Sequence, residues 1–235
     1  MEVLDHGFVR LVECWGHGDE GRVLDYVKST PVVREDYEVG IIEAARQSTQ
    51  GSFRGWDKDA KLLQYLYEHK HNTPFEFAGM VIEVRAPIMV YREWHRHRTQ
   101  SYNEMSARYA PLPELWYRPT LDRVMMKAGK QGGSEKELTR DLAEFFIDDM
   151  DSQCKTFAIR YKRALENGVP RELARIGMPV GWYSQMRASA CLRNWLAFLT
   201  LRLDPAAQWE IRQYAQAVGK LIETNFPQTW KLFCE

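Results

Sequence analysis

Segments in which apolar residues alternate with polar ones predict three strands in this chain. They run from Gly7 to Trp15, from Phe77 to Arg85 and from Trp182 to Ser189. In the second segment every other residue from Ala78 to Val84 is apolar, so these side chains are expected on one buried face. Pro87 is expected to end this strand, because its nitrogen carries no hydrogen for the ladder.

Apolar residues at spacings of three and four predict helices. The longest pattern predicts a helix from about Ser134, a candidate N-cap, to Asn167 and Gly168, a candidate C-cap pair. Asp204 followed by Pro205 is expected to begin the last helix. Shorter helices are expected over 38–47, 58–69, 88–96 and 191–199, and extended or irregular chain over 99–109.

Strands and long helices follow one another without regular alternation, and no internal repeat divides the 235 residues. We therefore expect one α+β domain that covers residues 1–235. Apolar residues make up 45% of the chain, which argues against intrinsic disorder. The 32 basic and 32 acidic residues cancel, which argues against a general nucleic-acid coat but leaves local charge open.

The first residues, the length of the apolar stretches and the spacing of the cysteines favour a soluble, cytoplasmic protein. The first residues lack a basic start followed by an apolar run, and no apolar stretch approaches the roughly 20 residues that span a bilayer. The cysteines are isolated rather than paired, as is typical of a reducing compartment. They are Cys14, Cys154, Cys191 and Cys234.

The segment from Arg92 to Arg108 holds the densest set of anion-binding side chains. Its four arginines, at positions 92, 96, 98 and 108, stand against only two acids, Glu93 and Glu104. Guanidinium groups offer planar, bidentate donors to phosphate. On an extended segment Ser101 and Asn103 would share a face, with Ser106 close by. The aromatic residues that interleave the charges indicate partial burial, so we favour a phosphate site over a solvated surface turn.

Metal binding and nucleophilic catalysis are both disfavoured. The two His-x-His pairs, at 69–71 and 95–97, lack a partner at zinc spacing, and neighbouring arginines repel a cation. No cysteine or serine has a local motif that places a base beside it. The Gly-rich segment 127–134 is not a phosphate loop, because its Gly-Lys is not followed by Ser or Thr. An enzyme of this composition would take its reactivity from a bound cofactor.

The run Arg-His-Arg-x-x-Ser-x-Asn-Glu-x-Ser-x-Arg, from Arg96 to Arg108, resembles the signature of the flavin-dependent thymidylate synthases. Further segments agree with that family in the same order, so that the resemblance spans roughly residues 8 to 225. They are Ala44 to Ser48, His71 to Glu76, Val169 to Arg175, Leu201 to Asp204 and Ala207 to Arg212.

The resemblance implies a central, mostly antiparallel sheet flanked by long helices, in a homotetramer whose active sites are shared between subunits. It implies the reductive methylation of dUMP to dTMP without a cysteine nucleophile. The carbon would come from methylenetetrahydrofolate and the hydride from NADPH through FAD.

The resemblance also implies roles for individual residues. Arg202 would lie on the uracil ring and favour its ionised imide. The FAD contacts would be Ser48, Thr73, Arg96, His97, Arg98, Glu104, Cys191, Arg193 and Ala197, with His71, Glu76 and Asn103 shaping the same pocket. The dUMP contacts would be Glu93, Arg96, Glu104, Met105, Ser106, Ala107, Arg108, Arg175 and Arg202.

Four positions depart from the family pattern. Cys191 and Ala197 stand where an amide or other polar group usually meets the flavin, Ala206 where a histidine is common, and Glu93 where a glutamine is common. Each lost hydrogen bond costs on the order of 1 kcal/mol, so we expect weaker or rearranged flavin contacts around 191–206.

Two alternatives stay open. The first is a specialised relative that methylates UMP at C5 by the same chemistry, since no residue is identified that reads the sugar 2′-hydroxyl. The second is a non-catalytic nucleotide- or RNA-binding module. It would use Arg96, Arg98 and Arg108 for phosphate, with Trp94 and Tyr102 for stacking.

Overall fold

A five-stranded antiparallel sheet lies at the centre of the computed structural model, which describes residues 1–16, 36–126 and 136–235. Within these ranges the strand order is β1-β2-β3-β5-β4. The strands are β1 (Glu2–Val3), β2 (Gly7–Trp15), β3 (Gly79–Pro87), β4 (Ser101–Glu104) and β5 (Tyr183–Cys191). The three predicted strands are therefore confirmed, and the expected α+β class with an antiparallel sheet is observed.

Strand β3 forms the middle of the sheet and pairs along its whole length with β5. It also pairs with β2, where a β-bulge shifts the register between Leu11 and Glu13. Met80, Ile82 and Val84 are fully buried on one face, as the alternation predicted. Pro87 is the last paired residue of β3, so it does end the ladder.

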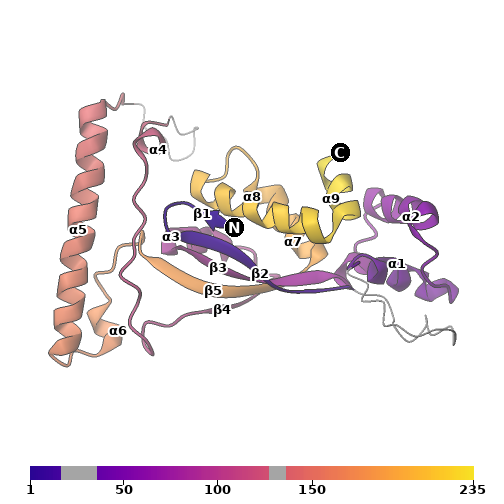
Figure 1. Ribbon diagram of the computed structural model, residues 1–235, viewed down its shortest axis with the longest axis horizontal. Helices are drawn as coiled ribbons and strands as arrows, with labels where there is room; N and C mark the ends of the chain where they lie inside the picture. The colour runs from indigo at the N-terminus through magenta and orange to yellow at the C-terminus, as the bar shows by residue number, and fades with distance from the viewer. Residues whose placement is uncertain (17–35, 127–135) are drawn as a thin grey trace.

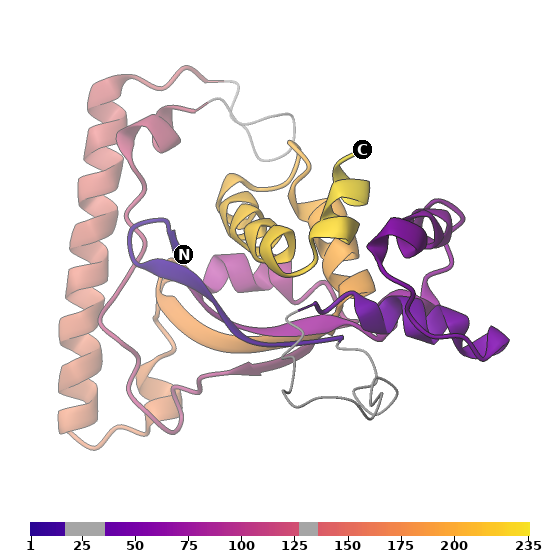
Figure 2. The ribbon, with the colours of Figure 1, turned by 45° about the vertical axis from the view of Figure 1, so that its right-hand side comes forward.

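Helices cover one face of the sheet, and those of the described ranges are given in chain order. They are α1 (Val39–Arg46), α2 (Trp56–Glu68), α3 (Ile88–Trp94), α4 (Leu121–Met125), α5 (Arg140–Glu166), α6 (Arg171–Ala174), α7 (Leu192–Arg202), α8 (Trp209–Asn225) and α9 (Pro227–Cys234), with 3-10 turns η2 (Gln47–Thr49) and η3 (Thr73–Glu76). Figures 1 and 2 show α3, α7 and α8 on the same side of the sheet, where Trp94, Trp195, Phe198 and Tyr214 form an aromatic core.

The opposite face of the sheet carries charged side chains. Arg10, Glu83 and Arg187 are aligned across β2, β3 and β5. The Glu83 carboxylate accepts hydrogen bonds from Arg10 (2.7 Å) and from the Gln185 amide (2.8 Å). In Figures 1 and 2 none of the labelled helices lies across this side of the sheet.

Helix α5 stands beside the sheet rather than on it (Figure 1). It packs through a small second cluster of Cys154, Ala158 and Trp182, and the Trp116 indole donates to Asp151 at 2.8 Å. At its C-terminal end the N–H of Val169 donates to the carbonyl of Ala164 and Gly168 has φ +79°, a Schellman arrangement. The predicted C-cap pair is thereby confirmed.

Three boundaries differ from the prediction. Helix α5 begins at Arg140, and the candidate cap Ser134 lies outside the described residues. Asp204 and Pro205 do not begin a helix, because Asp204 instead closes a turn by accepting hydrogen bonds from the N–H groups of Ala206 and Ala207. Helix α8 starts only at Trp209.

Helix α9 was not predicted, although Pro227 at its first position is a typical helix start.

None of the helices in the described ranges has the length and apolarity needed to cross a bilayer.

Candidate active site

The last residue of α7, Arg202, is held by three hydrogen bonds from one guanidinium group. Its Nε donates to Nε2 of His97 at 2.8 Å. One terminal nitrogen donates to the carboxylate of Glu93 at 2.6 Å, and the other to the backbone carbonyl of Glu93 at 2.8 Å. Glu93 lies in α3 and His97 in the turn after it, so a short segment of the sequence orients Arg202. The Arg202 side chain is only 14% exposed.

His97 is neutral in this arrangement. Burial lowers its pKa to about 4, and the positive charge of Arg202 adds to the effect while Glu93 opposes it. Because Nε2 accepts from Arg202, the proton of the neutral ring is on Nδ1. The ring also packs edge-on against Phe198 of α7, which fixes its plane.

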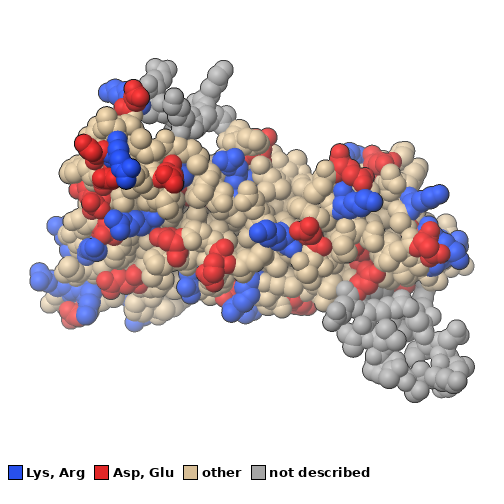
Figure 3. Space-filling model, turned by 45° about the horizontal axis from the view of Figure 1, so that its top comes forward, with Lys and Arg blue, Asp and Glu red and all other residues tan. Residues whose placement is uncertain are grey.

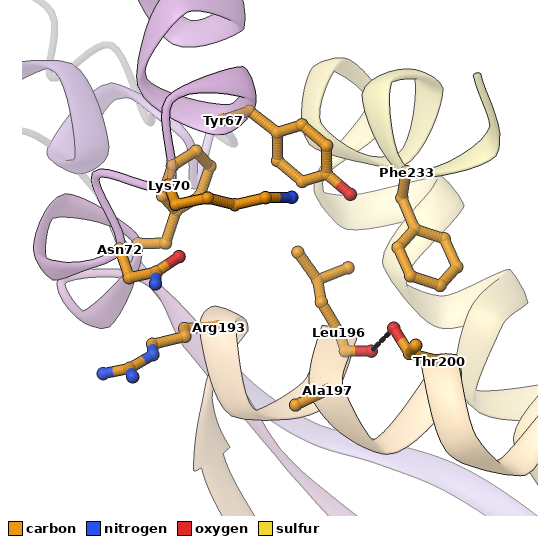
Figure 4. Close-up of a pocket in the computed structure, with 9 residues that line it drawn as sticks. Tyr67, Lys70, Asn72, Arg193, Leu196, Ala197, Thr200 and Phe233 are labelled. Atoms are coloured by element: carbon orange, nitrogen blue, oxygen red, sulfur yellow. Dashed lines mark hydrogen bonds between the residues drawn. The ribbon is translucent and has the colours of Figure 1, made fainter.

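The other face of α7 lines a cavity of about 220 Å³. The floor is formed by Leu196, Ala197 and Thr200, and the walls come from Tyr67 on α2 and Phe233 on α9. Figure 4 shows the Tyr67 hydroxyl and the Lys70 ammonium extending over Leu196, with the Phe233 ring on the opposite side. The cavity therefore combines aromatic walls with a cationic rim.

Two basic residues form this rim by different means. Lys70 adopts φ +58°, a left-handed conformation that is uncommon for residues other than glycine, and its ammonium lies 5.7 Å from the Tyr67 ring centroid. Arg193 forms an ion pair with Glu76 of η3. That pair and the lining residue Asn72 bring the expected cofactor segment at 71–76 against α7.

A separate group of expected substrate residues lies near α6. Arg108 forms an ion pair with Glu172 at 3.2 Å, and its backbone N–H donates to the hydroxyl of Ser106. Arg175 follows α6 directly, and among the described residues no carboxylate lies within ion-pair distance of its side chain. Figures 1 and 2 place α6 and α2 at opposite ends of the sheet, so this group is remote from the α7 cavity.

Strand β4 presents its residues to two different faces. Ser101 and Asn103 are exposed on one face, as predicted, whereas Tyr102 and Glu104 are half-buried on the other. Glu104 accepts a hydrogen bond from the Ser184 hydroxyl at 2.6 Å. The Met105 N–H donates to Gln185, and Ala107 is buried. Asn103 and Glu104 therefore do not face the same pocket within one copy of the chain.

The remaining expected contacts are exposed, except for the half-buried Cys191. Arg96 and Arg98 are exposed, and within the described ranges neither has a carboxylate at ion-pair distance. The Ser48 hydroxyl donates to the Ala45 carbonyl at 3.3 Å, as a helix-end hydroxyl does. His71 stacks on Tyr65. Cys191 is at the N-cap position of α7, where burial raises the pKa of its thiol.

Comparison with known proteins identifies the family. The family model of the thymidylate synthase complementing proteins matches residues 29–228. This chain belongs to that family. Curated family members named flavin-dependent thymidylate synthase include one from Thermus thermophilus, 37% identical over all of this chain and 78% of its own length, and one from Thermotoga neapolitana, 35% identical over 99% and 93%.

A solved structure agrees with this assignment to the thymidylate synthase complementing proteins. The UMP/dUMP methylase PolB from Streptomyces cacaoi, bound with 5-Br dUMP, superposes with a TM-score of 0.81. It is 28% identical, and the alignment covers 100% of this chain and 97% of PolB.

Several site residues of this family member were not identified from the sequence. Tyr67, Lys70 and Phe233 line the cavity, Ser184 holds Glu104, and Glu172 pairs with Arg108. Only Glu172 lay within a segment that resembled the family. The others meet the site through tertiary packing, for which the local sequence contains no signal. Across the parts of the chain that the structure describes, no group of three or more His, Cys, Asp or Glu residues could hold a metal ion.

Proposed function

We propose that this chain is a flavin-dependent thymidylate synthase. It converts dUMP to dTMP with methylenetetrahydrofolate as carbon donor and NADPH as reductant, in the cytoplasm and as one domain over residues 1–235. The observation that carries the proposal is the buried, oriented guanidinium of Arg202, found in a chain that belongs to this family.

Arg202 would activate the pyrimidine. Methylation at C5 needs an electron-rich ring, and loss of the N3 proton to solvent makes the ring anionic. A guanidinium beside this anion stabilises it. No nucleophile is required: in the described ranges the thiols of Cys14, Cys154, Cys191 and Cys234 all have a raised pKa, chiefly through burial.

The phosphate of dUMP would bind to Ser106, Arg108 and Arg175. These residues adjoin one another around α6, and Arg175 has a guanidinium without a carboxylate partner among the described residues. Arg108 would exchange Glu172 for the phosphate, because an exposed ion pair contributes little energy of its own. Met105 and Ala107 would offer their backbone to the nucleotide, and Glu93, Arg96 and Glu104 would complete its surroundings.

The cavity beside α7 fits part of an FAD molecule. Its aromatic walls suit a planar ring and its Lys70 and Arg193 rim suits a pyrophosphate, while its volume is below that of a whole dinucleotide site. Bound FAD would supply the redox step that NADPH drives. The residues at its surface would be Ser48, Thr73, Arg96, His97, Arg98, Glu104, Cys191, Arg193 and Ala197.

Self-association into a homotetramer would unite the two groups of residues. The α7 cavity and the α6 group lie at opposite ends of one copy. Near α6, Leu173 and Ile176 are 53% and 76% exposed, and on α5 Phe145 is 69% exposed. Apolar side chains this exposed are typical of protein interfaces. A second copy that covers them would place its own residues beside Arg108 and Arg175.

UMP is the second candidate substrate. The structural relative PolB is named a UMP/dUMP methylase, and its similarity extends over the whole chain.

The RNA-binding alternative has less support, because positive and negative side chains are interspersed on the face shown in Figure 3 and form no continuous basic track there.

An absorption spectrum and an isotope assay test the proposal. The purified protein, given FAD, is expected to show a bound flavin spectrum and to release tritium from [5-³H]dUMP when folate and NADPH are present. A protein that binds no flavin would exclude the proposed function. Equal turnover of [5-³H]UMP would show that the sugar is not discriminated, and polynucleotide binding without turnover would favour the RNA-binding module.

A further inference from the structure

The hydrogen bonds of Arg202 leave it with two free donors. A guanidinium has five N–H groups, of which Nε has one and each terminal nitrogen has two. His97 takes the Nε donor, and Glu93 takes one donor from each terminal nitrogen, through its carboxylate and its backbone carbonyl. One N–H therefore remains on each terminal nitrogen, in a plane that is fixed by three contacts.

We propose that Glu93 and His97 are positioning residues for Arg202, and that the carboxylate of Glu93 determines how strongly Arg202 stabilises the ionised imide of the substrate. The inference rests on the proposed function, because it takes the pyrimidine to be the ligand of Arg202. It goes beyond that function by assigning a charge-setting role to one residue.

Two donors that lie in one plane match the ionised imide and not the neutral one. Neutral uracil has an N–H at N3, which would face the N–H groups of Arg202 donor to donor. Loss of this proton turns N3 into an acceptor next to a carbonyl oxygen. The two free donors of Arg202 can then bind both acceptors, so the orientation imposed by Glu93 and His97 selects the anionic form.

Glu93 opposes this selection through its charge. Its carboxylate oxygen lies 2.6 Å from the Arg202 nitrogen, so the pair is neutral overall and an arriving anion meets a second negative charge. A like charge within about 4–6 Å raises the pKa of the group that ionises. His97 adds no charge, since burial keeps it neutral. Among the described residues no other charged side chain lies within ion-pair distance of Arg202 or Glu93.

Glu93→Gln separates the two effects. Glutamine keeps the side-chain oxygen and the backbone carbonyl that hold Arg202. It removes only the negative charge. The variant is therefore expected to orient Arg202 as before and to stabilise the imide anion more strongly.

The experiment is an ultraviolet titration of bound 5-bromo-dUMP, whose halogen brings imide ionisation into a convenient pH range. In Glu93→Gln the imide pKa of the bound ligand is expected to fall by about one unit relative to the native protein. Glu144→Gln, which removes the carboxylate of the exposed Arg140–Glu144 pair on α5, is the matched control and is expected to leave the pKa unchanged. An unchanged imide pKa in Glu93→Gln, with the ligand bound, would overturn the inference.

Turnover gives a second, independent measure. Glu93→Gln is expected to move the acidic limb of the kcat/KM profile for dUMP to lower pH by a similar amount, whereas Glu93→Ala, which frees a terminal nitrogen of Arg202, is expected to lower kcat about tenfold or more. A kcat/KM profile that is the same in all three proteins would contradict the role of Glu93. If the native protein bound no 5-bromo-dUMP, both the proposed function and this inference would be overturned.

Discussion

The buried carboxylate of Glu38 accepts a hydrogen bond from the backbone N–H of Thr229, 191 positions later in the chain, at 2.6 Å. Its other oxygen accepts from the N–H of Gln228 at 2.9 Å. Glu38 thus satisfies the free donors at the start of α9, and it ties the helix that carries Phe233 to the beginning of α1.

Replacement of Glu38 is therefore expected to destabilise the protein. Glu38→Gln leaves an N–H of α9 facing an amide donor in a buried place, which costs about 1–3 kcal/mol of unfolding free energy. Urea denaturation measures the loss. Glu223→Gln, an exposed change on α8, is the control and is expected to have no effect. Equal stability of the two variants would show that the cap contributes nothing.

The native Lys70 is expected to lower the free energy of unfolding and to strengthen FAD binding. Its φ of +58° favours glycine, so Lys70→Gly is expected to raise the unfolding free energy by up to about 1 kcal/mol. The same change removes the ammonium from the cavity and is expected to weaken FAD binding severalfold, as flavin fluorescence would show. Lys61→Ala, on the exposed side of α2, controls for loss of charge. Unchanged FAD affinity in Lys70→Gly would remove Lys70 from the cofactor site.

His97 predicts a pH dependence of stability. Its pKa is about 4 in the folded protein and near 6.5 when unfolded, so the unfolded chain binds more protons between these values. Stability is therefore expected to fall as pH decreases from about 6.5 to 4. In His97→Asn this part of the curve is expected to flatten, and thermal unfolding across the range would detect it. An equally steep decrease of stability with falling pH in His97→Asn would show that other titratable groups cause the pH dependence.

Arg202→Ala is expected to abolish activity without unfolding the chain. Loss of a charge-stabilising donor costs about 10²–10³ in kcat, which tritium release would measure. Circular dichroism is expected to be unchanged, since Arg202 is the last residue of its helix. Activity within a fewfold of native would defeat the role assigned to this residue.

Phe145→Glu tests self-association. A charge within the exposed apolar surface of α5 is expected to shift the protein to smaller assemblies in size-exclusion chromatography with light scattering. Enzymatic activity is expected to fall as well, because Ser106, Arg108 and Arg175 would lose the neighbouring copy of the chain. The matched change Asp149→Lys on the same face also alters charge but removes no apolar contact, and it is expected to have a smaller effect. An unchanged native assembly in Phe145→Glu would place the interface elsewhere.

The strands and the long helix α5 could be predicted because periodicity is a local property. The predicted helix start at Asp204–Pro205 was wrong. Asp and Pro are common both at helix starts and in turns, and tertiary packing decides which of the two forms. The cavity could not be predicted in full. Tyr67 and Phe233 are 166 positions apart, and they meet where α2 packs against α9, whose start is capped by Glu38.

The charged residues of the site were more predictable than their partners. The dense arginines between 92 and 108 pointed to anion binding, yet nothing local linked Glu93 to Arg202, 109 positions away. The opposite orientations of Asn103 and Glu104 follow from strand alternation, but only once β4 is known to be a strand.

Helix α7 fixes the spacing between the two ligand sites. Arg193 at its start faces the cavity and Arg202 at its end meets Glu93, and nine residues at 1.5 Å each separate them by about 14 Å along the axis. A helix cannot stretch, so this length is constant whatever the ligands do. A single inserted residue would also rotate Arg202 by about 100° relative to Arg193. The segment between them should therefore tolerate substitution far better than any change in length.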